Sequence, residues 1–178
     1  PKCGELERTR LASLVLESIY SDQKASKTDV LHISPENSLR KKFQKNYKSY
    51  ISADLHRKDV DRQFDVQNIP FSDESFDLVF ASHVLEYPED DRKAMSEIRR
   101  ILRKDGIAIL PVPLIHKKTK DNIERNPTNR MMHEPGLDFF ERYKDFFSSV
   151  KIYDPESFDH KFNLHEHETL NLLPVCKV

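Results

Sequence analysis

The fold is decided by residues 76–110, which read FDLVFASHVLEYPEDDRKAMSEIRRILRKDGIAIL. The stretch begins with Phe76–Ala81, a nearly continuous apolar run typical of a strand that is buried on both faces of a sheet. It closes with Ile107–Leu110, a second short apolar run. A helical pattern separates the two runs, so the stretch predicts a strand, a helix and a second strand parallel to the first.

The helix in this unit has its own start and stop signals. Pro88 and the acidic residues 89–91 are typical of a helix beginning, where carboxylates favour the positive end of the helix dipole. Apolar residues then recur at helical spacing, at Met95, Ile98, Ile101 and Leu102. We expect the helix to stop at Lys104–Gly106, with Gly106 in the left-handed backbone conformation that ends helices.

Strands and helices also alternate on the N-terminal side of this unit. Leu6–Tyr20 has the spacing of an amphipathic helix, and Pro35–Phe43 predicts a second helix. Further strands are predicted at Thr28–Ile33, Tyr50–Ala53 and Gln63–Asp65. This alternation predicts a mostly parallel sheet with helices on both faces.

The C-terminal third has a different pattern. Residues 115–135 are polar and show no clear period, so we expect a long loop over the active site. Leu137–Phe147 returns to helical spacing, and Ser149–Tyr153 and Leu170–Cys176 predict the last two strands. The residues between these strands are a poor crossover helix, so we expect the two strands to be antiparallel neighbours.

These elements predict one α/β domain over residues 1–178, with a mostly parallel seven-stranded sheet and an antiparallel final strand. A dinucleotide-binding dehydrogenase would instead continue its parallel sheet through crossover helices. The chain also lacks the glycine fingerprint of such an enzyme. The sequence therefore argues against a nicotinamide-dependent oxidoreductase.

Composition and charge give no support to nucleic-acid or membrane binding. The 29 Lys and Arg nearly balance the 30 Asp and Glu and are scattered, which offers no footprint for nucleic acid. No apolar run approaches the roughly 18 residues that cross a bilayer. Cys3 and Cys176 lie at opposite ends of the chain, which suits a reducing compartment. We expect a cytoplasmic protein without nucleic-acid or membrane partners.

Three stretches carry a family resemblance: DVQNIPF at 65–71, SFDLVFASHVLE at 75–86 and EIRRILRKDG at 97–106. Their sequence and spacing resemble the class I S-adenosylmethionine-dependent methyltransferases with a type 11-like domain. The resemblance implies the Rossmann-like class I methyltransferase fold and S-adenosylmethionine as the cofactor. It also implies methyl transfer to a small-molecule or sugar acceptor.

A narrower resemblance involves VLHISPE at 30–36 and the residues after the fifth predicted strand. Both are similar to a bacterial branch of the family that is found beside glycosyltransferases, and this is what suggests a sugar. That branch often begins with a Cys-x-x-Cys-Gly zinc knuckle, and residues 1–10 resemble its second half. The resemblance implies that Cys3 is the remnant of such a knuckle, although Cys3 alone cannot hold zinc.

The chain departs from the family at the turn after the first strand. Only Gly4, Gly106 and Gly136 are present, so no glycine-rich turn faces the methionine part of the cofactor. Asn37 and Ser38 stand where a glycine is expected. The departure leaves open an alternative, a catalytically inactive domain of the same fold that serves as a binding or interaction module.

The strand ends supply the candidate cofactor-binding residues, because open parallel sheets bind ligands there. Asp54 follows the second strand, where two carboxylate oxygens suit two ribose hydroxyls, and the alternative is a solvated turn. By resemblance, Asp65 accepts from the adenine amino group, unless it only caps a turn. By resemblance the turn through Glu36 lines the cofactor, although Glu36 equally suits a helix cap. The full set is His32, Ile33, Ser34, Glu36, Asp54, Leu55, Asp65, Val66 and Ser82.

Two histidines are candidate catalytic residues. His83 follows the fourth strand, and an ordinary imidazole pKa of about 6.5 permits proton transfer at neutral pH. We expect His83 to act as a general base or to orient the acceptor, the alternative being a hydrogen bond to a neighbouring loop. His133, by resemblance, lies in the loop that approaches the acceptor.

The histidine-rich segment near the C-terminus has permissive spacing for a metal, at His160, His165, Glu166 and His167. A polar connection between edge strands is more simply a solvated loop, so we expect no metal site. Five aromatic residues at helical spacing are assigned to packing rather than to a sulfonium cage, namely Phe139, Phe140, Tyr143, Phe146 and Phe147.

Overall fold

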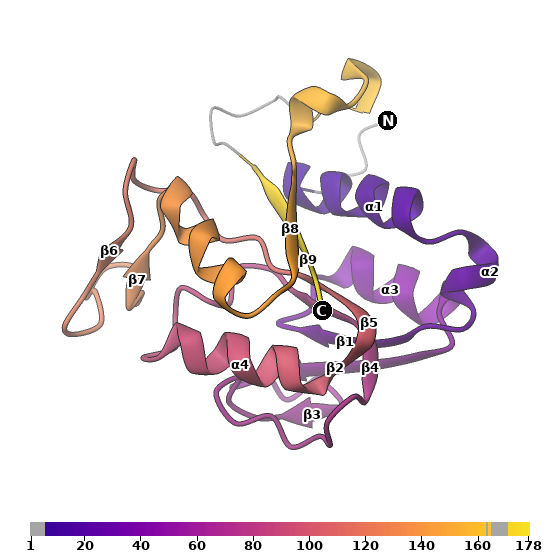
Figure 1. The fold of residues 1–178 in the computed structure, drawn as a ribbon, viewed down its shortest axis with the longest axis horizontal. Coiled ribbons are helices and arrows are strands. Elements are labelled where there is room, and N and C mark those ends of the chain that lie inside the picture. Colours follow the sequence, from indigo (N-terminus) through magenta and orange to yellow (C-terminus); the bar gives the residue numbers. More distant parts are fainter. Residues whose placement is uncertain (1–5, 163, 165–170) are drawn as a thin grey trace.

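The computed structural model describes residues 6–162, 164 and 171–178 (Figure 1). Its helices are α1 (Glu7–Ile19), α2 (Asp22–Ala25), α3 (Asn37–Asn46), α4 (Asp91–Ile101) and the 3-10 helices η1 (Leu137–Asp145), η2 (Pro155–Ser157) and η3 (His160–Phe162). Its strands are β1 (Asp29–Ile33), β2 (Ser49–Asp54), β3 (Arg62–Gln63), β4 (Phe76–Ala81), β5 (Leu102–Ile109), β6 (Lys120–Asp121), β7 (His133–Glu134), β8 (Ser149–Tyr153) and β9 (Leu173–Lys177).

One seven-stranded sheet organises the molecule, in the order β3-β2-β1-β4-β5-β9-β8. Leu31 of β1 pairs in parallel with Ile51 of β2 and with Val79 of β4. β9 runs antiparallel to both of its neighbours, β5 and β8. The predicted mostly parallel sheet with an antiparallel last strand is therefore confirmed.

Helices cover both faces of this sheet (Figure 1). Leu78 and Phe80 of β4 join a core that contains Leu11 and Val15 of α1 and residues of α3. Val79 of β4 points the other way, into a core built with α4 and η1. Burial on both faces explains why the sequence of β4 is a nearly continuous apolar run rather than an alternation of apolar and polar residues.

The expectation for Gly106 is wrong. α4 ends at Ile101 with Leu102 already extended, and Gly106 lies inside β5. The register between β4 and β5 shifts there, since Phe76 pairs with Leu102 but Leu78 pairs with Ile107. A Cβ on Gly106 would stand 2.9 Å from the carbonyl oxygen of Arg103. The glycine is needed for a close backbone approach at this irregularity, not for a helix end.

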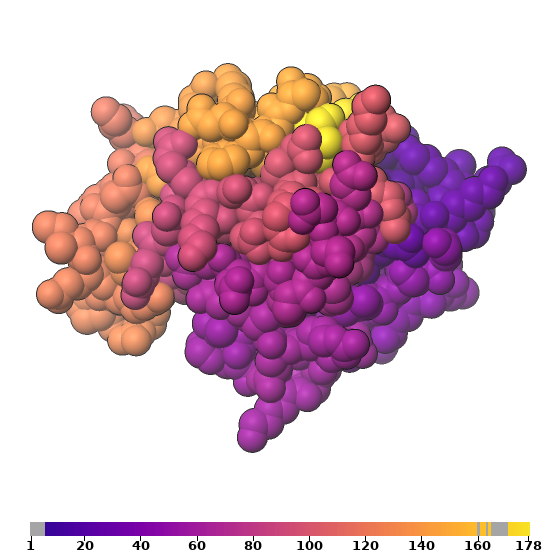
Figure 2. Space-filling view, turned by 60° about the horizontal axis from the view of Figure 1, so that its bottom comes forward, coloured from indigo at the N-terminus to yellow at the C-terminus, as the bar shows by residue number. Residues whose placement is uncertain are grey.

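The loop expected over residues 115–135 contains a small hairpin. β6 and β7 pair antiparallel, Lys120 with Glu134 and Asp121 with His133. Strands of two residues have no detectable period, so the sequence did not predict them. In the space-filling view the residues of this segment form a projecting body at one end of the molecule (Figure 2).

Candidate active site

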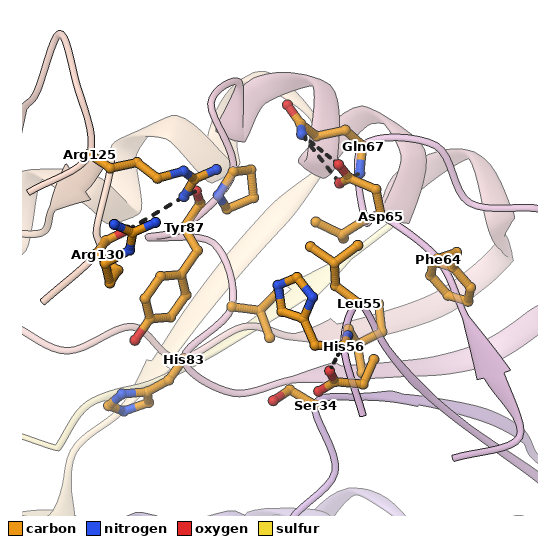
Figure 3. Close-up of a pocket in the computed structure, with 15 residues that line it drawn as sticks. Ser34, Leu55, His56, Phe64, Asp65, Gln67, His83, Tyr87, Arg125 and Arg130 are labelled. Carbon is orange, nitrogen blue, oxygen red and sulfur yellow. Dashed lines mark hydrogen bonds between the residues drawn. The ribbon is translucent and has the colours of Figure 1, made fainter. Parts of the chain in front are cut away.

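A cavity of about 620 Å³ opens at the carboxyl ends of β1, β2 and β4 (Figure 3). Open α/β sheets bind their ligands at this edge. The cavity is lined by Ile33, Ser34, Asp54, Leu55, His56, Phe64, Asp65, Val66, Gln67, His83, Val84, Tyr87, Pro88, Arg125 and Arg130. Seven of the predicted site residues are brought together in this wall: Ile33, Ser34, Asp54, Leu55, Asp65, Val66 and His83.

The turn after β1 has the backbone of a glycine turn without a glycine. Ser34 has a φ of 53°, in the left-handed region that glycine adopts most easily. Its backbone N–H donates to the carbonyl of Ala53, at 2.8 Å, which ties the turn to the end of β2. Serine tolerates this conformation at a cost of about 1 kcal/mol. The turn therefore takes this conformation with a serine, while Asn37 and Ser38, where a glycine is expected, begin α3.

His32, Glu36 and Ser82 lie outside the wall of the cavity. The His32 ring is fully buried against Phe43 and Phe80, on the face of the sheet that α1 and α3 cover. Its Nε2 lies 2.9 Å from Oε2 of Glu36. Burial opposes ionisation of Glu36, but hydrogen bonds from His32 and Ser82 hold its pKa below the ordinary value. His32 and Ser82 thus hold the Glu36 side chain in the turn between β1 and α3.

Asp54 is fixed by its own turn at the end of β2. Its Oδ1 accepts hydrogen bonds from the backbone N–H groups of His56 and Arg57, at 2.8 and 2.9 Å. Within the described part of the chain no hydrogen bond engages its Oδ2. One oxygen therefore orients the side chain and the other is available to a ligand in the cavity.

Asp65 is held in a similar way by Gln67. The Gln67 backbone N–H donates to Asp65 Oδ1 at 2.8 Å, and the Gln67 side-chain amide lies 3.1 Å from Oδ2. The Gln67 amide oxygen in turn accepts from the Asp90 backbone N–H at 3.0 Å, which links this turn to the start of α4. The neighbouring Val66 adds a buried apolar surface to the wall.

His83 lies in the cavity wall beyond the end of β4. Its φ is 54°, and its backbone N–H donates to the carbonyl of Pro111 at 2.9 Å. Burial, reinforced by the nearby charge of Arg8, lowers the pKa of His83 to about 4. The imidazole is therefore neutral at physiological pH.

Glu86 is a buried acid behind His83 to which the sequence assigned no role. Its carboxyl is fully enclosed, and neither oxygen has a hydrogen-bond partner among the described residues. Its Oε1 is 3.8 Å from Nδ1 of His83. Burial raises the pKa of Glu86 to about 8, so the acid is largely protonated at neutral pH. A strand-end acid after an apolar run was the only sequence signal for it.

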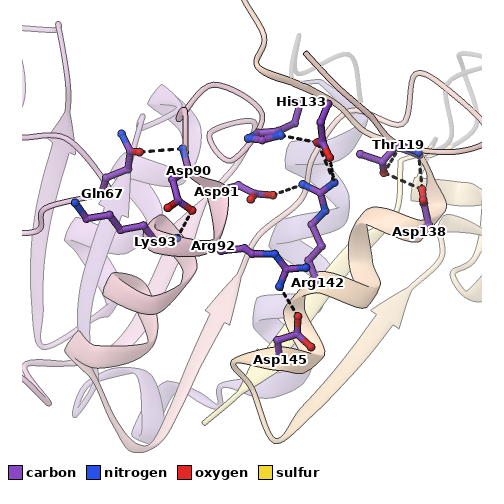
Figure 4. A network of polar contacts seen from close by, with 12 residues as sticks. Gln67, Asp90, Asp91, Arg92, Lys93, Thr119, His133, Asp138, Arg142 and Asp145 are labelled. Carbon is purple, nitrogen blue, oxygen red and sulfur yellow. Dashed lines mark hydrogen bonds and ion pairs between the residues drawn. The ribbon is translucent and has the colours of Figure 1, made fainter. Parts of the chain in front are cut away.

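His133 belongs to a polar network beside the cavity, not to its wall (Figure 4). Its Nδ1 lies 2.7 Å from Asp121 Oδ1. Arg142 donates to both oxygens of Asp121, at 2.9 and 2.8 Å, and to Asp91 at 2.6 Å. The network joins the hairpin to η1 and α4. The His133 backbone N–H also donates to the Glu86 carbonyl, at 3.1 Å.

Three further residues at the outer end of the cavity were not predicted, namely Tyr87, Arg125 and Arg130. The two arginines come from the segment expected to be a loop. Exposed arginines in a polar, aperiodic stretch have no distinguishing sequence pattern, and only the folded chain places them beside the strand ends.

No metal site is evident in the described residues, where no three His, Cys, Asp or Glu side chains are grouped to hold an ion. Cys3 of the expected zinc-knuckle remnant and the sequence His165–His167 lie outside the described residues, and nothing is placed for them. Within the described ranges, no helix is both long and apolar enough to cross a membrane.

Comparison with known families gives one clear match. A family model described as "Methyltransferase domain" matches residues 16–110, just over half of the 178-residue chain. The matched region contains β1 to β5 and all seven predicted site residues in the cavity wall. A search of curated proteins found no match.

Solved structures share the fold at low sequence identity. An S-adenosylmethionine-dependent methyltransferase from Mesorhizobium loti has a TM-score of 0.66 at 13% identity, covering 93% of this chain and 96% of that one. A Burkholderia thailandensis 1,6-didemethyltoxoflavin-N1-methyltransferase has a TM-score of 0.67 at 14% identity, covering 96% and 77%. The cyclase SpnF has a TM-score of 0.63 at 12% identity, covering 94% and 79%. At these identities the likeness shows the fold alone.

Proposed function

We propose that this chain, which belongs to the methyltransferase domain family, transfers a methyl group from S-adenosylmethionine to a small-molecule acceptor. The observation that carries the proposal is the cavity at the strand ends, whose wall includes Ser34, Asp54 and Asp65. A structural relative supports it, because the Burkholderia thailandensis enzyme was solved with S-adenosylhomocysteine and a small molecule, 1,6-didemethyltoxoflavin.

The residues of the cavity suit an adenosyl cofactor. Ser34 takes a left-handed backbone conformation at the end of β1, with a φ of 53°. Asp54 keeps one carboxylate oxygen to accept from the ribose hydroxyls, and Asp65 accepts from the adenine amino group. Leu55 and Val66 supply apolar surface for the adenine ring. His32, Glu36 and Ser82 act indirectly, by supporting the turn.

When S-adenosylmethionine is bound, it supplies the reactive methyl group. The protein then has to orient the acceptor and, where needed, remove a proton from it. His83 is suited to this task because its neutral imidazole has a free lone pair and lies in the cavity wall. We assign His133 a positioning role, since Asp121 and Arg142 hold it off the wall. The segment 115–135 covers the acceptor side.

The acceptor is proposed to be a sugar or another small molecule. The sugar is favoured by the similarity of residues 30–36 to the branch found beside glycosyltransferases. The cavity, at about 620 Å³, has the size of small-molecule sites, which span roughly 300–1,000 Å³.

An inactive binding module is the second candidate function, favoured by the absence of any glycine from the turn between β1 and α3. Thermal unfolding with S-adenosylhomocysteine, S-adenosylmethionine and NADH separates the two. We expect both sulfur compounds to raise the Tm by several degrees, because ligand at about 100 times its Kd adds about 2.7 kcal/mol to the free energy of unfolding. NADH should have no effect. Unchanged Tm values at millimolar sulfur ligand would favour the inactive module.

A further inference from the structure

The cavity has opposite charges at its two ends (Figure 3). Asp54 and Asp65 lie at the end formed by the strands, where the cofactor is proposed to bind. Arg125 and Arg130 lie at the other end, beside Tyr87 and close to His83. No carboxylate among the described lining residues stands at this arginine end. The charged lining residues described at this end are therefore both cationic.

Both arginines are placed by defined contacts. The guanidinium of Arg125 donates to the carbonyl oxygen of Tyr87 at 2.6 Å, which attaches the segment to the wall beyond β4. The Arg130 backbone N–H donates to the carbonyl of Asn126 at 2.8 Å, closing a short turn. Arg130 also has a φ of 65°, a conformation that non-glycine residues adopt only when the surrounding structure imposes it.

Two carboxylates of the same segment, those of Asp121 and Glu134, are engaged by other side chains. Glu134 accepts hydrogen bonds from His116, Asn122 and Asn126, which lower its pKa to about 2. Asp121 is taken by His133 and Arg142. No ion pair or hydrogen bond engages the Arg130 guanidinium within the ranges that the structure describes. Its charge faces the cavity without a counter-ion from those residues.

We propose that the acceptor is an acid, whose carboxylate or phosphate group binds Arg130 beside Arg125 at the outer end of the cavity. The inference rests on the proposed methyl transfer and narrows its acceptor class. A planar guanidinium can donate two parallel hydrogen bonds to a carboxylate or phosphate. A cationic acceptor would meet two like charges there, and a neutral acceptor would leave them uncompensated.

Isothermal titration on the protein saturated with S-adenosylhomocysteine tests this proposal with matched pairs of probes. D-glucuronate is compared with D-glucose, and 4-hydroxybenzoate with 4-hydroxybenzamide; glucose 6-phosphate tests phosphate. We expect at least one acid to bind about tenfold more tightly than its neutral partner, with the stronger response identifying carboxylate or phosphate. The absence of any preference for acids across the panel would overturn the proposal.

Variants assign that preference to a residue. Arg130→Ala should abolish the preference for the acid, and Arg130→Lys should keep part of it, because a lysine retains the charge but loses the bidentate geometry. Lys117→Ala is the matched control, since it removes an exposed cation from the same segment away from the cavity wall. An acid preference that survives in Arg130→Ala, or that Lys117→Ala removes equally, would contradict the assignment.

Binding of S-adenosylhomocysteine to each variant separates this inference from the proposed function. We expect Arg130→Ala to bind it as the unmodified protein does, because Arg130 lies across the cavity from Asp65. Acid binding that depends on Arg130 without any S-adenosylhomocysteine binding would overturn the methyl-transfer proposal and leave the anion site standing. Retained S-adenosylhomocysteine binding without a preference for acids would overturn the anion site and leave the methyl-transfer proposal standing.

Discussion

Different contacts hold the two ends of the cavity, the strand end with Asp54 and Asp65 and the arginine end with Arg125 and Arg130. Asp54 and Asp65 are each held by backbone N–H groups two or three residues further along the chain. Arg125 instead depends on Tyr87, and the hairpin beneath it depends on Arg142. Short-range turns orient the two proposed cofactor-binding aspartates. A short turn also places the Arg130 backbone, whereas the Arg125 side chain is held by a contact with a distant segment. The two ends should therefore respond differently to substitution.

The largest expected effect is at Asp54. Asp54→Ala should weaken binding of S-adenosylhomocysteine about 100-fold, because it removes a charged acceptor of ribose hydrogen bonds and the cap of its own turn. Asp54→Asn keeps an oxygen for the cap and isolates the loss of charge. His83→Ala, near the arginine end, should leave the affinity for S-adenosylhomocysteine unchanged. Isothermal titration measures all three, and equal losses in Asp54→Ala and His83→Ala would contradict the division between the two ends.

A second effect is expected at Glu86, the buried acid behind His83. Its pKa rises from an ordinary 4.5 to about 8 on folding, so between these values the folded state holds a proton that the unfolded state releases. Stability from this group is complete below the lower value and is lost as the pH rises through about 8. Glu86→Gln should remove that loss, which we expect to be about 1–3 kcal/mol.

Urea unfolding at about pH 5 and pH 9 measures the Glu86 effect as a difference between the variant and the unmodified protein. Glu141→Gln is the control, because Glu141 is exposed and pairs only with Lys144 in the described structure. Parallel pH dependences for the unmodified protein and Glu86→Gln would show that the buried acid does not titrate in this way.

The smallest expected effect is at Ser34, at the strand end. Ser34→Gly should stabilise the protein by about 0.5–1 kcal/mol, because glycine adopts a positive φ without a Cβ clash. Binding of S-adenosylhomocysteine should not weaken. Ser26→Gly is the control, since Ser26 has a φ of −64° and gains no such relief. Thermal unfolding gives the comparison, and a destabilisation of equal size at both serines would refute the account of the turn.

The sequence predicted most strands of the sheet because β-branched and apolar runs mark them, most clearly in β4, which is buried on both faces. Phe76–Ala81 was predicted with the bounds that β4 has, and Ser149–Tyr153 with those of β8. The weak point was irregular backbone. Gly106 was assigned to a helix end, but the register shift between β4 and β5 depends on pairing across strands, which no local pattern encodes.

Some residues of the candidate site were likewise predictable from regular strand geometry. Asp54, Asp65 and His83 follow strands at one edge of the sheet, so their positions could be anticipated from strand order alone. His32 precedes Ile33 on β1, and successive side chains of a strand point to opposite faces. This alternation, which the sequence already contained, explains why His32 is buried under the sheet while Ile33 lines the cavity.

Periodicity and turn chemistry in the sequence by itself determined the class of fold, the antiparallel last strand and the strand ends that meet at the cavity. These are short-range properties, because the pattern of apolar burial and local capping acts over a few residues. Tertiary structure alone decided that Ser34 takes a positive φ, that Glu86 is enclosed without a partner among the described residues and that two arginines face the cavity. Each depends on which distant segments pack together and which charges they leave uncompensated.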